Sequence, residues 1–133
     1  MIKMPHNIYI HVPFCMSKCN YCAFFSHACV NPDWGNFCTQ ICNEIEYWGQ
    51  KIPDTDVPTI FFGGGTPSLM PTWCVDKIIH TIDKNFQIEN NAEITLESNP
   101  KTIDKQKLNE IKKIGINRLS VGVQSLDDKN LEF

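Results

Sequence analysis

The chain has 133 residues, of which 42% are hydrophobic and 20% charged, a profile typical of a globular protein of at most one domain rather than a disordered tail. A formal net charge of -3 provides no basic surface for nucleic acid or an anionic membrane, so nucleic acid is not an expected partner. No apolar segment reaches the roughly 20 residues of a membrane span, and residues 1–10 lack the apolar core of a secretory signal, so we expect a cytoplasmic protein.

The first predicted element is a strand over residues 7–13, NIYIHVP, in which apolar and polar side chains alternate. It leads directly into a loop that holds Cys15, Cys19 and Cys22 with the spacing C-x3-C-x2-C. The remaining cysteines are scattered along the chain. Because free cysteine is often buried, we expect Cys38 and Cys42 to pack in the core from one face of the following helix.

That helix is predicted over residues 31–49. Asn31 is the expected N-cap, Pro32 the first helical residue and Gly49 the end of the helix. Apolar side chains recur at intervals of three or four and form one stripe, which consists of Trp34, Phe37, Ile41, Ile45 and Trp48.

The second half of the chain repeats the same alternation. Residues 57–65, VPTIFFGGG, are a short apolar run closed by glycines, which predicts a strand buried on both faces of a parallel sheet. A second helix begins at Pro71 and a third strand covers residues 92–98. A third helix ends at Gly115 with the signature of a left-handed C-terminal cap, and residues 116–125 form a fourth strand.

Strands and helices alternate through about three and a half units, which predicts an α/β fold with parallel pairing and right-handed crossovers. Residues 126–133 are expected to open a fourth helix. We therefore expect residues 1–133 to be the N-terminal part of a single larger (β/α) barrel domain, with an uncovered apolar sheet face. Polar or cysteine residues follow every strand, and in parallel sheets this carboxyl edge is where ligands bind.

The cysteine loop favours iron over zinc. Seven cysteines cannot all pair in disulfides, and thiols in a reducing cytosol remain available as metal ligands. A structural zinc site needs four ligands, for which only His27 or Cys29 stands near enough in sequence to be the fourth. Three thiolates on one loop instead suit a 4Fe-4S cluster whose fourth iron stays open. A nonenzymatic zinc or electron-transfer module remains an alternative.

The segment CMSKCNYC resembles the CxxxCxxC signature of the radical S-adenosylmethionine (SAM) enzymes. The resemblance implies a partial TIM barrel in which Cys15, Cys19 and Cys22 are the iron ligands of a 4Fe-4S cluster. It also implies that the amino and carboxylate groups of SAM chelate the open iron. One electron from the reduced cluster then cleaves SAM to methionine and a 5′-deoxyadenosyl radical.

The same resemblance implies the SAM contacts. GGGTP lacks the features of a phosphate-binding loop, since no Gly-Lys-Ser/Thr follows and Ser68 stands where a dinucleotide fingerprint needs glycine or alanine. It resembles the segment that binds the amino group of SAM. Glu97 matches the acidic residue of the family that contacts SAM, whereas His11 is expected to be merely packed or solvated. The expected SAM contacts are Tyr9, Tyr21, Gly64, Gly65, Thr66, Glu97 and Gln124.

Four segments, IYIHVPFC, FFGGGTPS, LESNP and INRLSVGVQS, together resemble one branch of this superfamily. It contains the oxygen-independent coproporphyrinogen III oxidases and their HemW-like relatives, which are haem chaperones. The oxidases extend the signature to CxxxCxxCxC, whereas this chain has Phe24 at the position of the last cysteine, which favours the chaperone side.

The implied function is then to bind haem and deliver it to haem proteins. SAM-dependent oxidative decarboxylation of coproporphyrinogen III is the alternative, so whether the protein is an enzyme stays open. The implied partners are haem, recipient haem proteins and a low-potential electron donor, with membrane contact only through a recipient protein.

Overall fold

A four-stranded parallel sheet organises residues 5–131, the part of the chain that the computed structural model describes. Its strands lie in the order β1 (Ile8–Val12), β4 (Asp56–Gly64), β5 (Gln87–Ser98) and β6 (Arg118–Val121). Successive strands are connected by the helices α1 (Trp34–Lys51), α2 (Thr72–Asn85) and α3 (Lys105–Lys113). The short strands β2 (Phe14–Cys15) and β3 (His27–Ala28) pair separately, and the 3-10 turns are η1 (Pro67–Leu69), η2 (Pro100–Thr102) and η3 (Asp128–Asn130).

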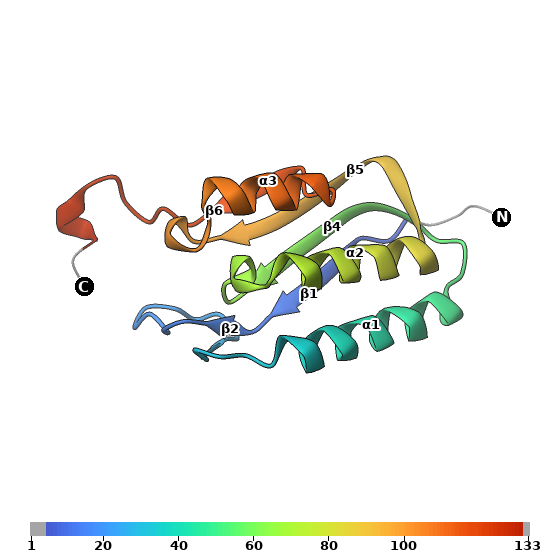
Figure 1. Ribbon diagram of the computed structural model, residues 1–133, viewed down its shortest axis with the longest axis horizontal. Helices are drawn as coiled ribbons and strands as arrows, with labels where there is room; N and C mark the ends of the chain where they lie inside the picture. The colour runs from blue at the N-terminus through green and yellow to red at the C-terminus, as the bar shows by residue number, and fades with distance from the viewer. Residues whose placement is uncertain (1–4, 132–133) are drawn as a thin grey trace.

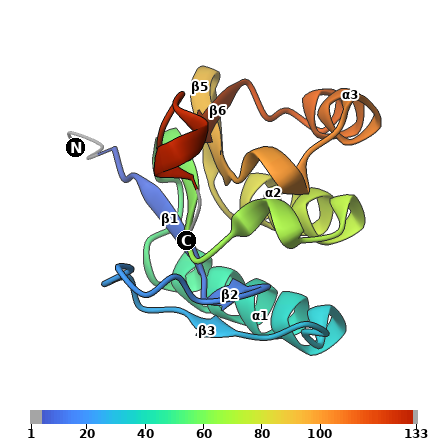
Figure 2. The same ribbon diagram turned by 90° about the vertical axis from the view of Figure 1, so that its left-hand side faces the viewer.

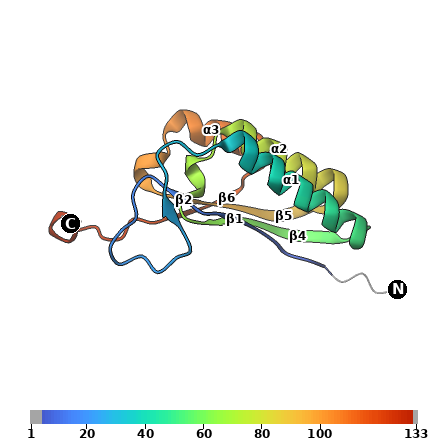
Figure 3. The same ribbon diagram turned by 90° about the horizontal axis from the view of Figure 1, so that it is seen from below.

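All three helices lie on one face of the sheet, and the opposite face is bare (Figure 3). The strands point toward one end of the molecule, where the cysteine loop and the last described residues also lie (Figure 1). Because the strand order follows the sequence and the helices share a face, the three crossovers have the same hand. The predicted parallel α/β architecture is confirmed.

The hydrophobic core lies between the sheet and the helices. Neighbouring strands place Ile10, Phe62 and Leu96 side by side in one row, and Phe62 and Leu96 are fully buried. Cys38 and Cys42 on α1 pack into this core with exposed fractions of 1% and 6%, so the prediction that they are core residues is confirmed. None of the helices in the described range is long and apolar enough to cross a membrane.

The predicted limits of the first helix are wrong at both ends. Asp33, not Asn31, is the N-cap, because its Oδ1 accepts a hydrogen bond of 2.9 Å from the backbone N–H of Asn36. The helix continues through Gly49 to Lys51. Gly49 is buried against α2, where a Cβ would lie 2.6 Å from the Cβ of Asn85. The glycine therefore serves close helix packing rather than helix termination.

The predicted apolar stripe of this helix also needs a correction. Trp48 is 49% exposed and lies outside the packed face. The buried positions are centred instead on Cys38, Cys42, Ile45 and Gly49. Small residues occupy this face because it packs closely on α2. The prediction followed the large apolar residues instead and therefore included the exposed Trp48.

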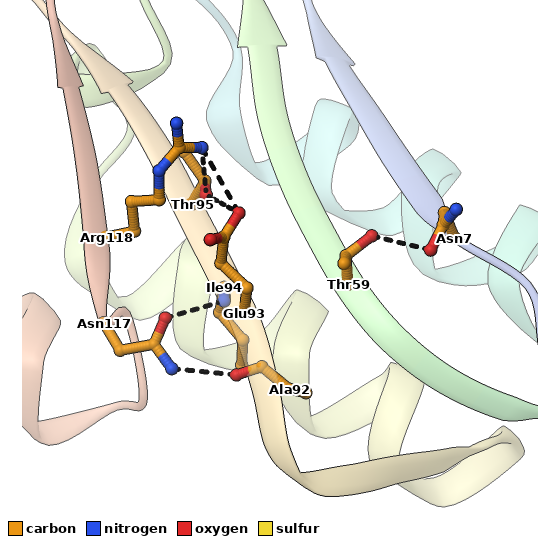
Figure 4. Close-up of polar contacts among 8 residues, drawn as sticks. All are labelled: Asn7, Thr59, Ala92, Glu93, Ile94, Thr95, Asn117 and Arg118. Carbon is orange, nitrogen blue, oxygen red and sulfur yellow. Dashed lines mark hydrogen bonds and ion pairs between the residues drawn. The ribbon is translucent and has the colours of Figure 1, made fainter.

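The bare face of the sheet carries mainly polar side chains beside the stacked pair Tyr9 and Phe61, so the expected uncovered apolar face is largely polar instead. Figure 4 shows the side chain of Arg118 donating to Glu93 at 3.2 Å and to Thr95 at 3.3 Å. Further along the same face, Thr59 donates to Asn7 at 2.8 Å. These residues alternate in sequence with the core residues, so the strands are buried on the helix side and polar on the other.

The third strand begins earlier than predicted, at Gln87 rather than residue 92. Beyond the reach of β6, the side chain of Asn117 acts as a further pairing partner for this strand (Figure 4). Its amide accepts from the N–H of Ile94 and donates to the carbonyl of Ala92, each at 2.8 Å. A side-chain amide therefore extends the pairing of β5.

The end of the described chain is confirmed at one point and corrected at another. Gly115 has a φ of 105°, as the predicted left-handed cap requires. The sequence predicts that residues 126–133 open a helix, but the described part of this range, residues 126–131, has the 3-10 turn η3 capped by Asp127 instead. Residues 132–133 lie outside the described residues.

Candidate functional site

A cleft of about 760 Å³ lies at the carboxyl ends of the strands. Three parts of the chain wall it: the cysteine loop, the segment that follows β4, and the ends of β5 and β6. Figure 2 views the molecule onto this end of the sheet. The volume is within the range of pockets that hold drug-sized molecules.

Most of the residues expected from the sequence meet in this cleft. Those that line it are Cys15, Cys19, Tyr21, Cys22, Gly65, Thr66, Glu97 and Gln124. Two expected residues do not line it. Tyr9 lies on the bare face of β1 with 56% of its surface exposed, and Gly64 is within β4 beneath the rim of the cleft. Segments separated by up to about a hundred residues are thus brought together at one edge, as parallel strands require.

The cysteine loop is open and mostly exposed. Cys19 is exposed, whereas Cys15 and Cys22 are half-buried. Within the loop, Nζ of Lys18 donates to the carbonyl oxygen of Ser26 at 2.9 Å. A hydrogen bond to Cys19 is the main reason that the pKa of Tyr21 is raised.

The cysteine loop supplies three thiols, which are soft metal ligands, to the lining of the cleft. Within residues 5–131, no three His, Cys, Asp or Glu side chains are gathered closely enough to hold a metal ion. The three loop cysteines nevertheless supply every thiol among the described residues that line the cleft, and neither His27 nor Cys29 reaches it. Among the described residues that line the cleft there is no histidine and no fourth cysteine, so the fourth nitrogen or sulfur ligand of a structural zinc site is missing there.

Three contacts attach the glycine segment to the end of β1 and the start of the cysteine loop. The backbone N–H groups of Gly65 and Thr66 donate to the carbonyl oxygens of Val12 at 2.7 Å and Phe14 at 2.8 Å. The hydroxyl of Thr66 also lies 3.6 Å from Sγ of Cys15. The first cysteine and the glycine segment therefore form one unit.

Two glycines are required in this unit for different reasons. Gly64 has a φ of 117°, a conformation that disfavours any residue with a side chain. At Gly65 a Cβ would lie 2.6 Å from the carbonyl oxygen of Phe14 and 2.9 Å from Sγ of Cys15. The glycines allow the backbone to pass directly beside the first cysteine, which explains why this segment is glycine-rich.

Glu97 lies at the end of β5 and faces the same segment. Its Oε2 accepts a hydrogen bond of 3.1 Å from the backbone N–H of Gly64. The pKa of Tyr9 is raised, first by partial burial and then by the negative charge of Glu97. Glu97 also lines the cleft, and a carboxylate can accept hydrogen bonds from hydroxyl or amine groups of a ligand.

His11 has a larger role than the sequence suggested. Its Nε2 lies 2.8 Å from the carbonyl oxygen of Phe25, which can only accept, so Nε2 carries the proton. In the neutral ring Nδ1 is then an acceptor, and it receives the hydroxyl of Tyr9 at 3.0 Å. His11 thus ties the end of the cysteine loop to β1. A lone histidine on an alternating strand gives no sign of this contact.

Gln124 reaches the cleft from a strained backbone. Its φ is 65°, in the left-handed region, which costs a non-glycine residue about 1–2 kcal/mol. Strain of this kind is often found at ligand sites.

Of the cleft residues that follow Glu97, Ser98 and Asn99 belong to the polar strand end that the sequence indicates, whereas sequence reasoning missed Lys101 and Thr102. The signal was present in ESNPKT, because Asn99 is a capping residue. Its side chain accepts from the N–H of Lys101 at 3.0 Å, and Thr102 donates back to the carbonyl oxygen of Asn99 at 2.8 Å. This turn shapes the β5 side of the cleft.

Comparisons with known proteins agree with this geometry. The family model described as the radical SAM superfamily matches residues 9–133. The curated protein "Heme chaperone HemW" from Synechocystis is 40% identical over 96% of this chain and 32% of its own length. The protein of the same name from Escherichia coli is 34% identical over 99% of this chain and 35% of its own length. The chain thus spans about a third of the length of these curated relatives.

A solved structure has the same fold. Coproporphyrinogen III oxidase (HemN) from Escherichia coli, described as a radical SAM enzyme, superimposes with a TM-score of 0.83. The two chains are 27% identical, and the match covers 96% of this chain and 30% of the oxidase. The parallel sheet with its helices on one face is therefore the arrangement found in the oxidase.

Proposed function

The chain belongs to the radical SAM superfamily, and from that membership we propose that the cleft binds a 4Fe-4S cluster and SAM for a HemW-like haem chaperone. Cys15, Cys19 and Cys22 are the proposed iron ligands. The cofactors follow from the family, and the choice of residues is supported by three thiols in one cleft whose described lining has no histidine and no fourth cysteine. When bound, the reduced cluster supplies one electron that cleaves SAM.

The residues of the chain divide the task of holding SAM. We propose that Gly65 and Thr66 present backbone and hydroxyl groups to its methionine moiety, and that Glu97 accepts hydrogen bonds from its polar groups. Gly64, which does not line the cleft, is proposed to act through its hydrogen bond to Glu97. Tyr21 and Gln124 lie on opposite walls of the cleft and are proposed further contacts. Tyr9, which lies outside the cleft, is proposed to act through its hydrogen bond to His11. The observation on which the proposal rests is the contact of Thr66 with Cys15, which places a thiol of the cysteine loop next to the glycine segment.

The chaperone function is supported by the curated relatives and by Phe24. The relatives named above are haem chaperones, and this chain is 34% and 40% identical to them. Phe24 lines the cleft with 64% of its surface exposed and stands where the oxidases have a fourth cysteine. The proposed partners are haem, the haem proteins that receive it and a low-potential electron donor. We place the protein in the cytoplasm, with membrane contact only through a recipient.

The alternative is oxidative decarboxylation of coproporphyrinogen III, which the structural match to the oxidase favours. The two functions separate in one experiment on the natural protein, reconstituted anaerobically with iron and sulfide. We expect saturable haem binding in an optical titration and no decarboxylated product when coproporphyrinogen III, SAM and a reductant are supplied. Product formation at a rate comparable to that of an oxidase would contradict the chaperone proposal. A metal fully ligated by protein and insensitive to SAM would contradict both.

A further inference from the structure

Lys107 connects the third helix to the segment behind the glycine run. It lies on α3, and its Nζ donates to the backbone carbonyl oxygens of Ser68 and Met70, the latter at 2.8 Å. These two residues lie in and directly after η1, which begins one residue after Thr66. One ammonium group thus fills two acceptors on the far side of the segment that lines the cleft.

The segment that Lys107 holds has little freedom. Ser68 and Met70 are fully buried, with exposed fractions of 0%. Burial lowers the pKa of Lys107, although the carboxylates of Glu110 and Asp104 act in the opposite direction. The ammonium group of Lys107 is therefore partly desolvated, a cost that an apolar side chain at this position would not have.

A second contact joins the same segment to the other wall of the cleft. The hydroxyl of Thr102 donates its proton to the carbonyl oxygen of Asn99. The hydroxyl of Ser68 contacts the Thr102 hydroxyl, so Ser68 is the donor in that contact. Thr102 belongs to the turn that follows Glu97. The segments that follow β4 and β5 are thus joined by the contact between Ser68 and Thr102. The hydrogen bond from Gly64 to Glu97 joins the ends of the same two strands.

The glycine segment is consequently held from two sides. On one side Gly65 and Thr66 bind the backbone around Phe14, and on the other Lys107 binds Ser68 and Met70. We propose that Lys107 is a positioning residue that holds the glycine segment in the conformation that binds SAM. This inference rests on the proposed function of the cleft. Lys107 does not line the cleft and acts through the backbone of residues 66–70.

The variant Lys107→Met tests this inference in the natural, anaerobically reconstituted protein. Methionine keeps an unbranched apolar stem of similar shape but leaves both carbonyl oxygens without their donor. Ile111, with an exposed fraction of 1%, and the 2.9 Å hydrogen bond from Thr72 to Glu110 keep α3 in place in the variant. We expect SAM to bind about tenfold more weakly, a difference of about 1.4 kcal/mol, with unchanged iron content.

Two further variants separate positioning from general stability. Lys107→Arg retains several donors at a similar reach and is expected to restore SAM affinity to within about threefold of the natural protein. Lys112→Met removes an exposed lysine from the same helix and is the matched control. Hydrogen exchange should become faster at residues 64–70 in Lys107→Met and remain unchanged in the control. If the methionine variant does not accumulate, Lys107→Leu, which also has no donor, carries the same expectation.

The outcomes distinguish this inference from the function on which it rests. If the natural protein assembles a cluster and binds SAM, and Lys107→Met binds SAM equally well, the positioning role is wrong and the proposed function stands. A lower melting temperature with unchanged SAM affinity and unchanged local exchange also overturns it, since the lysine would then be only structural. If the natural protein itself does not bind SAM, the proposed function fails first.

Discussion

Two walls of the cleft differ in how firmly the protein holds them: the cysteine loop, and the segments that follow β4 and β5. The cysteine loop has exposed aromatic side chains, with Tyr21 61%, Phe24 64% and Phe25 82% exposed, and only the two-residue strands β2 and β3 as regular structure. The wall that follows β4 and β5 contains the fully buried Ser68 and Met70 and is tied to α3. The segments that follow β4 and β5 are thus held by the core, whereas the cysteine loop has few buried contacts and, in the proposed function, is ordered by the cluster that it binds.

This difference has a physical cause. Metal binding to thiolates contributes folding free energy, so a loop that carries three metal ligands does not need a core of its own. A segment that presents backbone groups to a small molecule gains affinity when it is already ordered before binding. The contrast predicts that substitutions in the loop remove the metal and leave the fold, whereas substitutions in the other wall affect stability and SAM affinity together.

The largest effect is expected from Cys19→Ala, which should abolish cluster assembly and leave the protein folded. Cys19 is exposed, so its side chain contributes little to packing, but three thiolates are needed to hold the cluster. The measurement is the visible absorption of the anaerobically reconstituted protein, together with its iron content. Cys38→Ala is the control and should retain the full spectrum, because Cys38 is buried between α1 and α2. An undiminished spectrum in Cys19→Ala would contradict the ligand assignment.

The next largest effect is expected from Gly65→Ala, which acts where the two walls meet. Its Cβ would collide with the carbonyl oxygen of Phe14 at 2.6 Å, and overpacking of this kind lowers the free energy of unfolding by about 1–3 kcal/mol. We also expect loss of SAM binding, since the clash moves the glycine segment away from Cys15. Denaturant unfolding and SAM titration of the natural protein provide the two measurements.

Gly35→Ala is the matched glycine control. It lies in the first turn of α1, where a Cβ would meet only Oδ1 of Asp33 at 3.4 Å. Its unfolding free energy should stay within about 1 kcal/mol of that of the natural protein, and its SAM affinity should not change. Equal effects at Gly35 and Gly65 would remove the distinction between the two glycines.

The smallest effect is expected from Glu97→Gln, which keeps the shape of the side chain and removes its charge. Hydrogen bonds to charged acceptors are stronger than those to neutral ones, so SAM should bind about tenfold more weakly. The negative charge of Glu97 raises the pKa of Tyr9, so its removal should lower that pKa toward the ordinary value. The ultraviolet absorption of the phenolate then appears at a lower pH in the variant than in the natural protein.

Glu93→Gln is the control for this change. Glu93 lies on the same strand but forms an exposed ion pair with Arg118 at 3.2 Å, and pairs of this kind contribute only about 0–1 kcal/mol. It should alter neither SAM affinity nor the titration of Tyr9. If Glu93→Gln and Glu97→Gln weaken SAM binding equally, the carboxylate at the cleft has no special role.

Local sequence by itself determined the order of the elements, the C-x3-C-x2-C loop, the glycine segment and the left-handed cap at Gly115. These features depend on the spacing of neighbouring residues or on the backbone freedom of a single glycine, and both can be read from a short stretch of chain. Eight of the ten residues expected at the site line the cleft because they lie at or after the carboxyl ends of the strands of a parallel sheet.

Only the tertiary structure decided the contacts between distant segments. The packing of Gly49 against Asn85, the bond of His11 to Phe25 and the reach of Lys107 to Ser68 each join residues from separate elements. The polar character of the bare sheet face likewise emerges only when alternating positions of four strands are set side by side. A lysine or a histidine carries no mark of its partner in the chain, because the donor and the acceptor meet only after the helices have packed onto the sheet.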